Sequence, residues 1–159
     1  MSRAWLVLLG LVLSAGISGV AAADTDLTRL ERAISKNLGR PYVLGSTGIK
    51  SYDCSGFVWR VLTDAGVFIK RTSARKYYFA MPEVEGGKEA QYAFGQLVFF
   101  DDLRHVGIVA DEESFFHAQT GQGTRRSPFD PYWRTKLIGF RAIPLSTAAG
   151  SPAVAARDR

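Results

Sequence analysis

The sequence predicts a single α+β domain in which helices come first and an antiparallel sheet follows. Three observations predict it: apolar residues recur at helical spacing in the first half, short β-rich runs separated by acidic turns follow Gly95, and no internal repeat is present. The apolar fraction of 47%, with ten Phe, six Tyr and three Trp, is typical of a chain that buries a core.

The first 23 residues are typical of a secretory signal. Arg3 precedes an apolar run from Ala4 to Leu13, and Ala21-Ala22-Ala23 supplies a small-residue cleavage site. Cleavage after Ala23 would export the protein to the periplasm or the cell wall. The run from Ala4 to Ala23 is also long enough to span a bilayer, so an uncleaved membrane anchor is the alternative. No cysteine lies near this cleavage site, which excludes a lipoprotein anchor.

Two amphipathic helices are expected next. The first covers residues 27–38. Thr28-x-x-Glu31 is typical of a capping box at its start, and Gly39 is expected to end the helix. A loop rich in Gly and Ser follows to residue 52. The second helix covers residues 53–65 and ends before Gly66, with one apolar stripe that we expect to be buried.

The rest of the chain is expected to form the sheet. Arg71-Thr72-Ser73 would cap a short helix to Met81, and residues 82–93 have the composition of a polar loop. Strands are expected at residues 96–100, 106–110, 115–119 and 137–143. The domain would therefore cover residues 24–145, and the Ala-, Ser- and Pro-rich tail from 146 to 159 is expected to be disordered.

Cys54 is the only cysteine, and it lies at the expected start of the second helix. A lone thiol in an oxidising compartment is open to oxidation and mixed disulfides. We therefore interpret this exported cysteine as a reactive nucleophile. The positive end of the helix dipole favours its thiolate, and an imidazole in contact would give a thiolate–imidazolium pair.

The two histidines of the chain, His105 and His117, both lie in the strand region. A turn centred near Asp111 would place them about opposite one another, with both rings on the same side of the sheet. His105 is the expected base, and His117 would fix its tautomer. Backbone N–H groups around Cys54, helped by the Tyr42 hydroxyl, would bind the oxyanion. The predicted chemistry is amide hydrolysis through a thioester.

Each residue also has a structural interpretation. A buried cysteine is often only a small apolar residue, and two strand histidines can be a polar pair. Zinc is a further alternative, but no CxxC or HExxH pattern supports a metal site. Asp53 can be no more than a helix cap. The formal charge of +5 is compatible with an anionic partner or with an ordinary solvated surface. The expected export and the lack of a nucleic-acid-binding motif argue against nucleic acid as that partner.

Several motifs together resemble the NlpC/p60 family of cell-wall hydrolases. The resemblance covers residues 26–143 in the family's order and spacing. The segments that carry it are Pro41-Tyr42, Asp53-Cys54-Ser55-Gly56-Phe57-Val58, Arg71-Thr72-Ser73, Gly95-Gln96-Leu97-Val98-Phe99-Phe100, His105-Val106-Gly107-Ile108-Val109, Phe116-His117-Ala118 and Pro131-Tyr132-Trp133.

The resemblance implies a papain-like α+β fold and a Cys54–His105–His117 triad. Tyr42 matches a tyrosine that lines the family's active site, and Asp53 and Ser55 match positions that help to shape the substrate subsite. Members cleave peptide bonds in peptidoglycan stem peptides, commonly next to D-glutamate or meso-diaminopimelate, and no metal or organic cofactor is implied. Many relatives have Tyr-x-Tyr-Gly-Gly at Tyr42-Val43-Leu44-Gly45-Ser46, and Gly-Asp-Leu at Gly95-Gln96-Leu97. The first departure changes the wall of the groove.

Other functions fit part of these observations. The same triad would serve an exported amidase or lipid acyltransferase, or an antibacterial toxin that a regulatory or immunity protein restrains. A non-catalytic wall-binding module would be expected to carry an altered triad, and the residues are intact. Peptidoglycan stem peptides are the expected partner, and a membrane is a partner only if the signal remains uncleaved.

Overall fold

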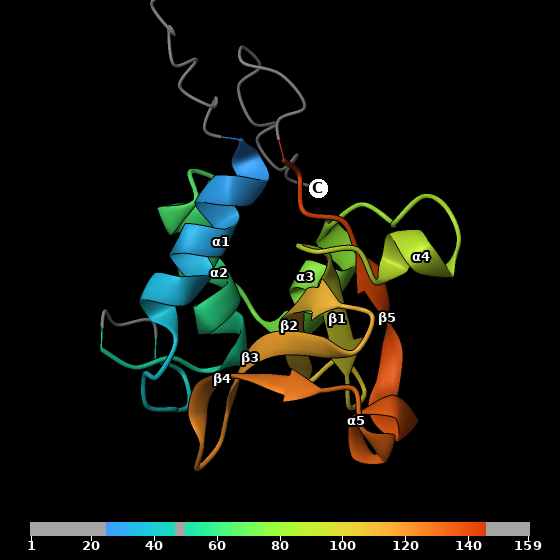
Figure 1. The fold of residues 1–159 in the computed structure, drawn as a ribbon. Helices are drawn as coiled ribbons and strands as arrows, with labels where there is room; N and C mark the ends of the chain where they lie inside the picture. The colour runs from blue at the N-terminus through green and yellow to red at the C-terminus, as the bar shows by residue number, and fades with distance from the viewer. Residues whose placement is uncertain (1–24, 47–49, 146–159) are drawn as a thin grey trace, which may run out of the picture.

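The computed structural model describes residues 25–46 and 50–145, and within these ranges the chain is an α+β protein (Figure 1). The helices are α1 (Asp26–Asn37), α2 (Cys54–Asp64), α3 (Ala74–Ala80), α4 (Lys88–Gln91) and α5 (Pro131–Lys136). The strands are β1 (Leu97–Phe100), β2 (His105–Asp111), β3 (Ser114–Gln119), β4 (Gly123–Pro128) and β5 (Leu137–Arg141). They form one antiparallel sheet in the order β4-β3-β2-β1-β5, which confirms the predicted fold class.

The expected signal segment, residues 1–23, and the expected tail, residues 146–159, lie outside the described residues. In the part of the chain that is described, every helix is too short or too polar to span a bilayer.

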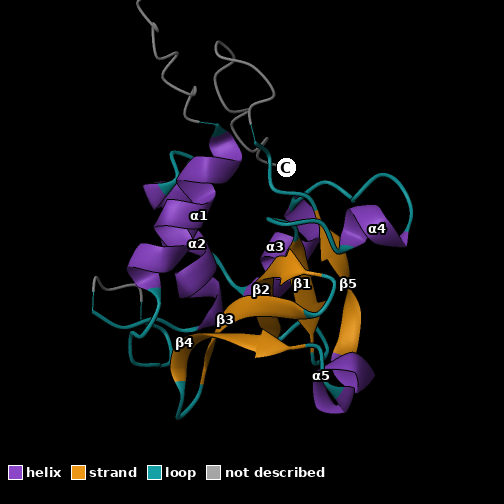
Figure 2. Cartoon of the chain, viewed as in Figure 1, coloured by secondary structure: helices purple, strands orange, loops and turns teal. Residues whose placement is uncertain are grey.

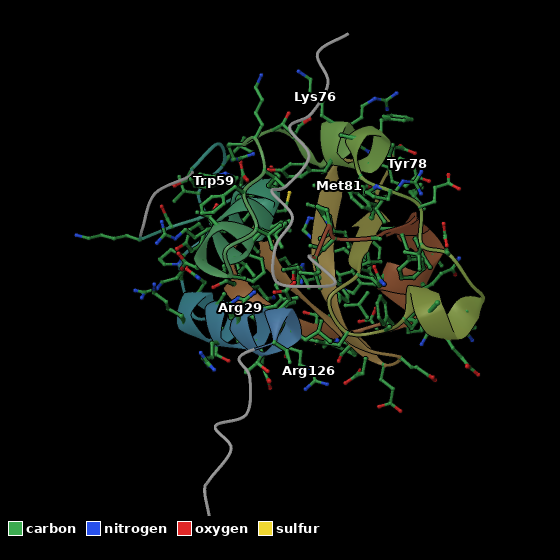
Figure 3. All side chains as sticks on the ribbon, turned by 90° about the horizontal axis from the view of Figure 1, so that it is seen from above. Arg29, Trp59, Lys76, Tyr78, Met81 and Arg126 are labelled. Atoms are coloured by element: carbon green, nitrogen blue, oxygen red, sulfur yellow. The ribbon has the colours of Figure 1, made fainter. Side chains whose placement is uncertain are left out.

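The sheet buries apolar side chains on both faces because successive strand residues point to opposite sides. On one face, Leu97, Phe99 and Val106 share a core with α1, α2 and α3. On the other, Val98, Phe100 and Phe115 share a second core with residues at the end of α4 and on α5. Figure 2 shows α1 and α2 to one side of the strands and α5 beyond them. Seen from above, Lys76 of α3 lies at one margin of the molecule, and Arg29 lies on α1 in the opposite half (Figure 3).

The helix caps agree with the sequence prediction except at α1. The N–H of Thr28 donates to Thr25 Oγ1 at 3.2 Å, so Thr25 is the cap and Thr28 lies in the first turn. The capping box expected at Thr28 is therefore wrong. Asp53 caps α2 by accepting from the Gly56 N–H at 2.6 Å, and Gly66 follows the helix with φ +87°. Ser73 caps α3, as the Arg71-Thr72-Ser73 motif predicts.

Three elements were not predicted. The helix α4 lies inside residues 82–93, where a polar loop was expected. The strand β4 has the sequence Gly-Thr-Arg-Arg-Ser-Pro, and its two consecutive arginines are both exposed. It therefore lacks the alternation of apolar and polar residues on which strand prediction depends. The helix α5 is six residues long, too short for a periodic pattern, although Asp130 and Pro131 form the cap and first position of a standard helix start.

Candidate active site

The nucleophile candidate, Cys54, is the first residue of α2 and is 8% exposed. Its thiol donates to the carbonyl oxygen of Arg104 across an Sγ–O distance of 3.7 Å. Arg104 directly precedes His105 at the start of β2. The capped start of α2 and the start of β2 therefore bring the thiol next to the segment that carries the first histidine.

The two histidines contact each other directly. His105 Nε2 lies 2.8 Å from His117 Nδ1, so both rings project from the same side of the sheet, as the sequence predicts. They are not opposite one another, because Ile108 pairs with Phe116 and Val109 with Phe115. The turn lies one residue further along than expected, which makes the histidines diagonal neighbours.

Gly107 makes room for this diagonal contact. A Cβ at Gly107 would lie 2.8 Å from Phe115 Cδ2 and 3.4 Å from His117 Cβ. The first of these distances is closer than carbon atoms approach without displacement. The glycine therefore lets β3 carry two rings against β2 at this point.

A buried serine completes the hydrogen-bonded chain. His117 is fully buried, and its Nε2 lies 2.9 Å from Ser127 Oγ on β4. If this hydroxyl accepts the Nε2 proton, His117 Nδ1 is an acceptor and His105 Nε2 is the donor between the rings. His105 Nδ1 then carries the free lone pair that a base needs. Sequence reasoning missed Ser127 because it missed β4, and a lone serine in a polar run gives no signal.

Trp133 on α5 forms one wall around both imidazoles. Its ring stacks on His105 at a centroid distance of 5.1 Å and an interplanar angle of 29°. The same ring meets His117 edge-on at 5.0 Å and 89°. Phe115 lies against His117 at 4.6 Å. The ring that the sequence motif Pro131-Tyr132-Trp133 supplies therefore holds the orientation of the candidate base.

Burial controls the protonation states of these groups. It lowers the pKa of His105 to about 4, against the opposing effect of the Asp101 carboxylate. Burial first, and then the neighbouring His105, lower the pKa of His117 to about 3. Burial, and then the Asp53 carboxylate, raise the pKa of the Cys54 thiol, while nearby backbone N–H groups including that of Val106 oppose the rise.

These shifts favour the neutral thiol and the neutral imidazoles at neutral pH. This differs from the thiolate–imidazolium pair expected from the helix dipole, because removal of water from the buried thiol outweighs the dipole. The backbone N–H groups of Val106, Ser55 and Cys54 favour the anionic sulfur, so they are placed to stabilise a thiolate that forms during reaction.

Asp53 and Ser55, which flank the nucleophile, are bonded mainly within the fold. Arg71 Nη2 donates to both carboxylate oxygens of Asp53 at 2.8 and 2.9 Å, and its Nη1 donates to Ser55 Oγ at 2.9 Å. The Gly45 N–H also donates to Asp53. Arg71 thus links the loop before α2, the start of α2 and the segment before α3. A role of Asp53 and Ser55 in a substrate subsite stays a prediction.

Tyr42 lines a cavity of about 240 Å³ that also contains His105. The loop carrying Tyr42 is fixed by an isolated parallel bridge to Tyr52, and the Tyr42 hydroxyl hydrogen-bonds to the Thr120 side chain. Burial raises the pKa of this hydroxyl, so it stays protonated as a donor. The complete lining is Tyr42, Asp101, His105, Ala118, Gln119, Thr120, Tyr132, Trp133 and Lys136.

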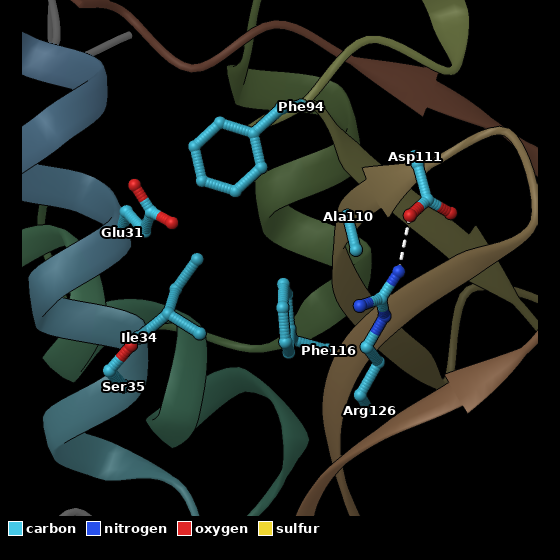
Figure 4. Close-up of a pocket in the computed structure, with 8 residues that line it drawn as sticks. All are labelled: Glu31, Ile34, Ser35, Phe94, Ala110, Asp111, Phe116 and Arg126. Atoms are coloured by element: carbon cyan, nitrogen blue, oxygen red, sulfur yellow. Dashed lines mark hydrogen bonds and ion pairs between the residues drawn. The ribbon is translucent and has the colours of Figure 1, made fainter.

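A second cavity, of about 190 Å³, lies between α1 and the sheet (Figure 4). It is lined by Glu31, Ile34, Ser35, Phe94, Ala110, Asp111, Phe116 and Arg126, and it contains neither the cysteine nor a histidine. Its Arg126 is ion-paired with Asp111. Across residues 25–46 and 50–145, no three His, Cys, Asp or Glu side chains are grouped so that they could hold a metal ion.

Comparison with known proteins finds relatives of most of this chain. The sequence profile of the NlpC/P60 family matches residues 39–142. A probable peptidoglycan endopeptidase, LytE of Bacillus subtilis, is 32% identical over 108 residues, which are 65% of this chain and 30% of LytE. A probable endopeptidase of Haemophilus influenzae is 35% identical over 114 residues, which are 66% of this chain and 67% of that protein.

Solved structures show the same fold. An NLP/P60-family protein of Staphylococcus aureus, described as similar to a lipoprotein, superposes with a TM-score of 0.62 at 28% identity, covering 74% of this chain and 41% of that one. The peptidoglycan hydrolase RipB of Mycobacterium tuberculosis superposes with a TM-score of 0.56 at 21% identity, covering 76% of this chain and 65% of that one. The chain spans less than a third of the length of LytE and of the p60 endopeptidases of Listeria that it also matches.

Proposed function

Because the chain belongs to the NlpC/P60 family, we propose that it is a cysteine peptidase that hydrolyses amide bonds in peptidoglycan stem peptides. The observation that carries the proposal is the hydrogen bond from His105 to His117 beside the buried thiol of Cys54. Relatives named as peptidoglycan endopeptidases support the substrate class. Export to the periplasm or cell wall, with cleavage after Ala23, belongs to the same proposal.

The proposed reaction begins at the thiol. Cys54 Sγ attacks the carbonyl carbon of the scissile amide while its proton moves to Nδ1 of His105, the nitrogen that His117 leaves free. The imidazolium is stabilised by its hydrogen bond to His117. The backbone N–H of Cys54, together with the Tyr42 hydroxyl, would donate to the oxyanion of the tetrahedral intermediate.

Collapse of that intermediate breaks the C–N bond. The imidazolium of His105 gives its proton to the leaving amine, and the acyl part stays on Cys54 as a thioester. His105 then takes a proton from a water molecule that attacks the thioester. The products are a carboxylic acid and the restored thiol, so the cycle needs no further reactant.

The test is mass spectrometry of muropeptides after purified peptidoglycan is incubated with the protein. We expect a new cleaved stem peptide with the wild type and none with Cys54→Ala, since a small apolar residue at a helix start preserves the fold. The mass of the product identifies the cleaved bond.

Three outcomes would overturn the proposal. Full activity of Cys54→Ala would rule out Cys54 as the nucleophile. Absence of any product from a folded protein whose Cys54 still reacts with iodoacetamide would point to another amide or ester substrate, as for an amidase or an acyltransferase. Inhibition by a chelator with recovery on zinc addition would replace the thiol mechanism by a metal-dependent one.

A further inference from the structure

Asp53 places a negative charge directly beside the nucleophile candidate. It caps α2, immediately precedes Cys54 and is 7% exposed, so solvent screens its charge only weakly. Burial first, and then this carboxylate, raise the pKa of the Cys54 thiol. The carboxylate therefore opposes the thiolate that the proposed reaction has to form.

Arg71, in the segment before α3, supplies the opposite charge. Its Nη2 donates to both carboxylate oxygens of Asp53, at 2.8 and 2.9 Å. Its Nη1 donates to Ser55 Oγ at 2.9 Å. Asp53 and Ser55 are the residues before and after Cys54, so one guanidinium is bonded to both sequence neighbours of the thiol.

Asp53 has other donors that hold it in place. The backbone N–H of Gly56 donates to Oδ1 at 2.6 Å, and that of Gly45 donates to Oδ2 at 3.1 Å. The Ser55 hydroxyl also donates to Oδ1, at 3.1 Å. These groups carry only partial charges, so the contribution that distinguishes Arg71 is a full positive charge.

The titratable groups on the other elements around the thiol are uncharged near neutral pH. Burial raises the pKa of the Tyr42 hydroxyl, which comes from the loop before α2. Burial lowers the pKa of His105 on β2 to about 4 and that of His117 on β3 to about 3. The carbonyl oxygen of Arg104 accepts from the thiol, but the Arg104 side chain is 70% exposed and lies against Asp101. The ion pair at the start of α2 therefore sets the charge next to the thiol.

We propose that Arg71 is a positioning residue for the nucleophile, which offsets the charge of Asp53 and so favours formation of the Cys54 thiolate during reaction. It acts through the residues on either side of the cysteine rather than on the reacting atoms. Its effect is on the electrostatics of the thiol, in addition to the link between segments described above. This role rests on the proposed function, in which Cys54 is the nucleophile.

The test is the rate at which iodoacetamide alkylates Cys54 as a function of pH, a readout that needs no substrate. In Arg71→Met the N–H groups of Gly45 and Gly56 still hold an ionised Asp53, whose charge is no longer offset. The inflection of the alkylation rate should therefore move up by about one pH unit, which is an about tenfold slower reaction at neutral pH. Arg71→Lys keeps the positive charge and should stay close to the wild type.

Asp53→Asn should have the opposite effect. Asparagine is a preferred helix cap, so the start of α2 is retained while the charge of Arg71 is left unpaired. The inflection should move below that of the wild type. The double variant Arg71→Met with Asp53→Asn carries neither charge, and its inflection should return close to the wild-type value. A role of Arg71 in packing alone predicts instead that the double variant reacts no faster than Arg71→Met.

Arg60→Met is the matched control. Arg60 Nη2 lies 2.8 Å from Asp64 Oδ1 on the same helix, and the Arg60 side chain is 25% exposed, against 24% for Arg71. Asp64 is the last residue of α2 and lies about 15 Å along the helix axis from Cys54. Because this substitution breaks an ion pair of similar burial at the other end of α2, it should keep the wild-type inflection.

Each outcome supports or overturns the role of Arg71. Equal inflections for the wild type and a folded Arg71→Met, or a double variant as slow as Arg71→Met, would overturn it. The same shift in Arg60→Met would assign the effect to general surface charge and would also overturn it. If circular dichroism shows that Arg71→Met does not fold, Asp53→Asn is compared with the double variant, since these two differ only at Arg71. Equal inflections for those two would again overturn the role.

Failure of the proposed function gives a different result. Muropeptide cleavage is measured separately from alkylation. The expected order of inflections, in protein that leaves peptidoglycan intact, would support the effect of Arg71 on Cys54 and overturn the proposed hydrolysis. Cleavage of peptidoglycan by protein in which Arg71→Met leaves the inflection unchanged would do the reverse.

Discussion

Burial sets the resting protonation states of Cys54 and His105, and this makes their chemistry distinguishable from that of a preformed ion pair. The raised pKa of the thiol and the lowered pKa of the imidazole both favour the neutral forms at neutral pH. The base then takes the thiol proton during the attack on substrate. A neutral thiol is also less open to oxidation than a thiolate, because the thiolate is the reactive form.

The first prediction concerns the pH dependence of alkylation. The rate at which iodoacetamide modifies Cys54 should be low at pH 6–8 and should rise with an inflection above the ordinary thiol pKa of about 8.5. His105→Ala should leave this profile nearly unchanged. A high plateau from pH 5 to 8 that disappears in His105→Ala would contradict the neutral pair and support a thiolate–imidazolium pair.

The second prediction concerns Ser127. Ser127→Ala removes the partner of His117 Nε2, so the tautomer of His117 is no longer fixed, and kcat/KM should fall about tenfold. Nitrogen-15 chemical shifts of the imidazoles should show a changed tautomer population. Ser114→Ala is a matched control, because Ser114 is a buried hydroxyl of the same sheet that bonds Asp111 and Arg126 instead. Equal losses of activity in both variants would reduce Ser127 to a structural role.

At the scale of elements, the site depends on how closely β2 and β3 approach. Gly107→Ala should lower the free energy of unfolding by about 1–3 kcal/mol, since its methyl group would overlap the ring of Phe115. Displacement of His117 should also lower kcat, by a larger factor than it changes KM. Urea unfolding and peptide hydrolysis measure the two effects.

Gly139→Ala is the control for this substitution. It lies on β5, where the added methyl would meet only the outer end of the Tyr78 side chain, with its nearest approach to the hydroxyl at 3.2 Å. If Gly107→Ala were no more destabilising than Gly139→Ala and kept its activity, the close approach of β2 and β3 would not matter for the site.

Local signals account for the elements that the sequence predicts. Asp53 and Ser73 are caps followed by apolar stripes or aromatic residues, and Gly66 is a standard helix stop, so α2 and α3 could be located. Strands β1, β2 and β3 are rich in β-branched and aromatic residues. The strand β4 is held by its pairing with β3, and its polar sequence gives no local indication of this pairing.

The same distinction applies to the site. Cys54, His105 and His117 could be singled out because few residues have their chemistry and because spacing suggested a hairpin. The hydrogen bond to Ser127, the stacking of Trp133 and the link from Arg71 to Asp53 join residues that are distant in sequence. No local pattern predicts which residues meet in this way.

At the scale of the whole molecule, the buried His117 and the partly buried His105 make stability depend on pH, because both pKa values are lowered in the folded state. Each has an unfolded pKa of about 6.5, and the folded values are about 4 for His105 and about 3 for His117. Above pH 6.5 both histidines are neutral in the folded and in the unfolded state, so their titration does not lower the stability of the fold. As pH falls toward the folded values, the unfolded chain binds protons that the folded chain does not, so stability falls.

The prediction is a loss on the order of 3 kcal/mol for each histidine across this range, measured by urea unfolding between pH 7.5 and 4.5. His117→Asn should have a shallower pH dependence, because it removes one of the titrating groups. An identical slope in that variant would mean that the folded histidines titrate normally.

The measurement that tests the account most directly is capture of the acyl-enzyme on Cys54. The protein is mixed with a synthetic stem peptide, quenched in acid during the first turnover, digested and analysed by mass spectrometry. We expect the peptide that contains Cys54 to gain the mass of the acyl part of the substrate, and hydroxylamine to remove it. The Cys54→Ala protein should show neither adduct nor product. Turnover by Cys54→Ala, or an adduct on any other residue, would contradict the assignment of Cys54 as the nucleophile.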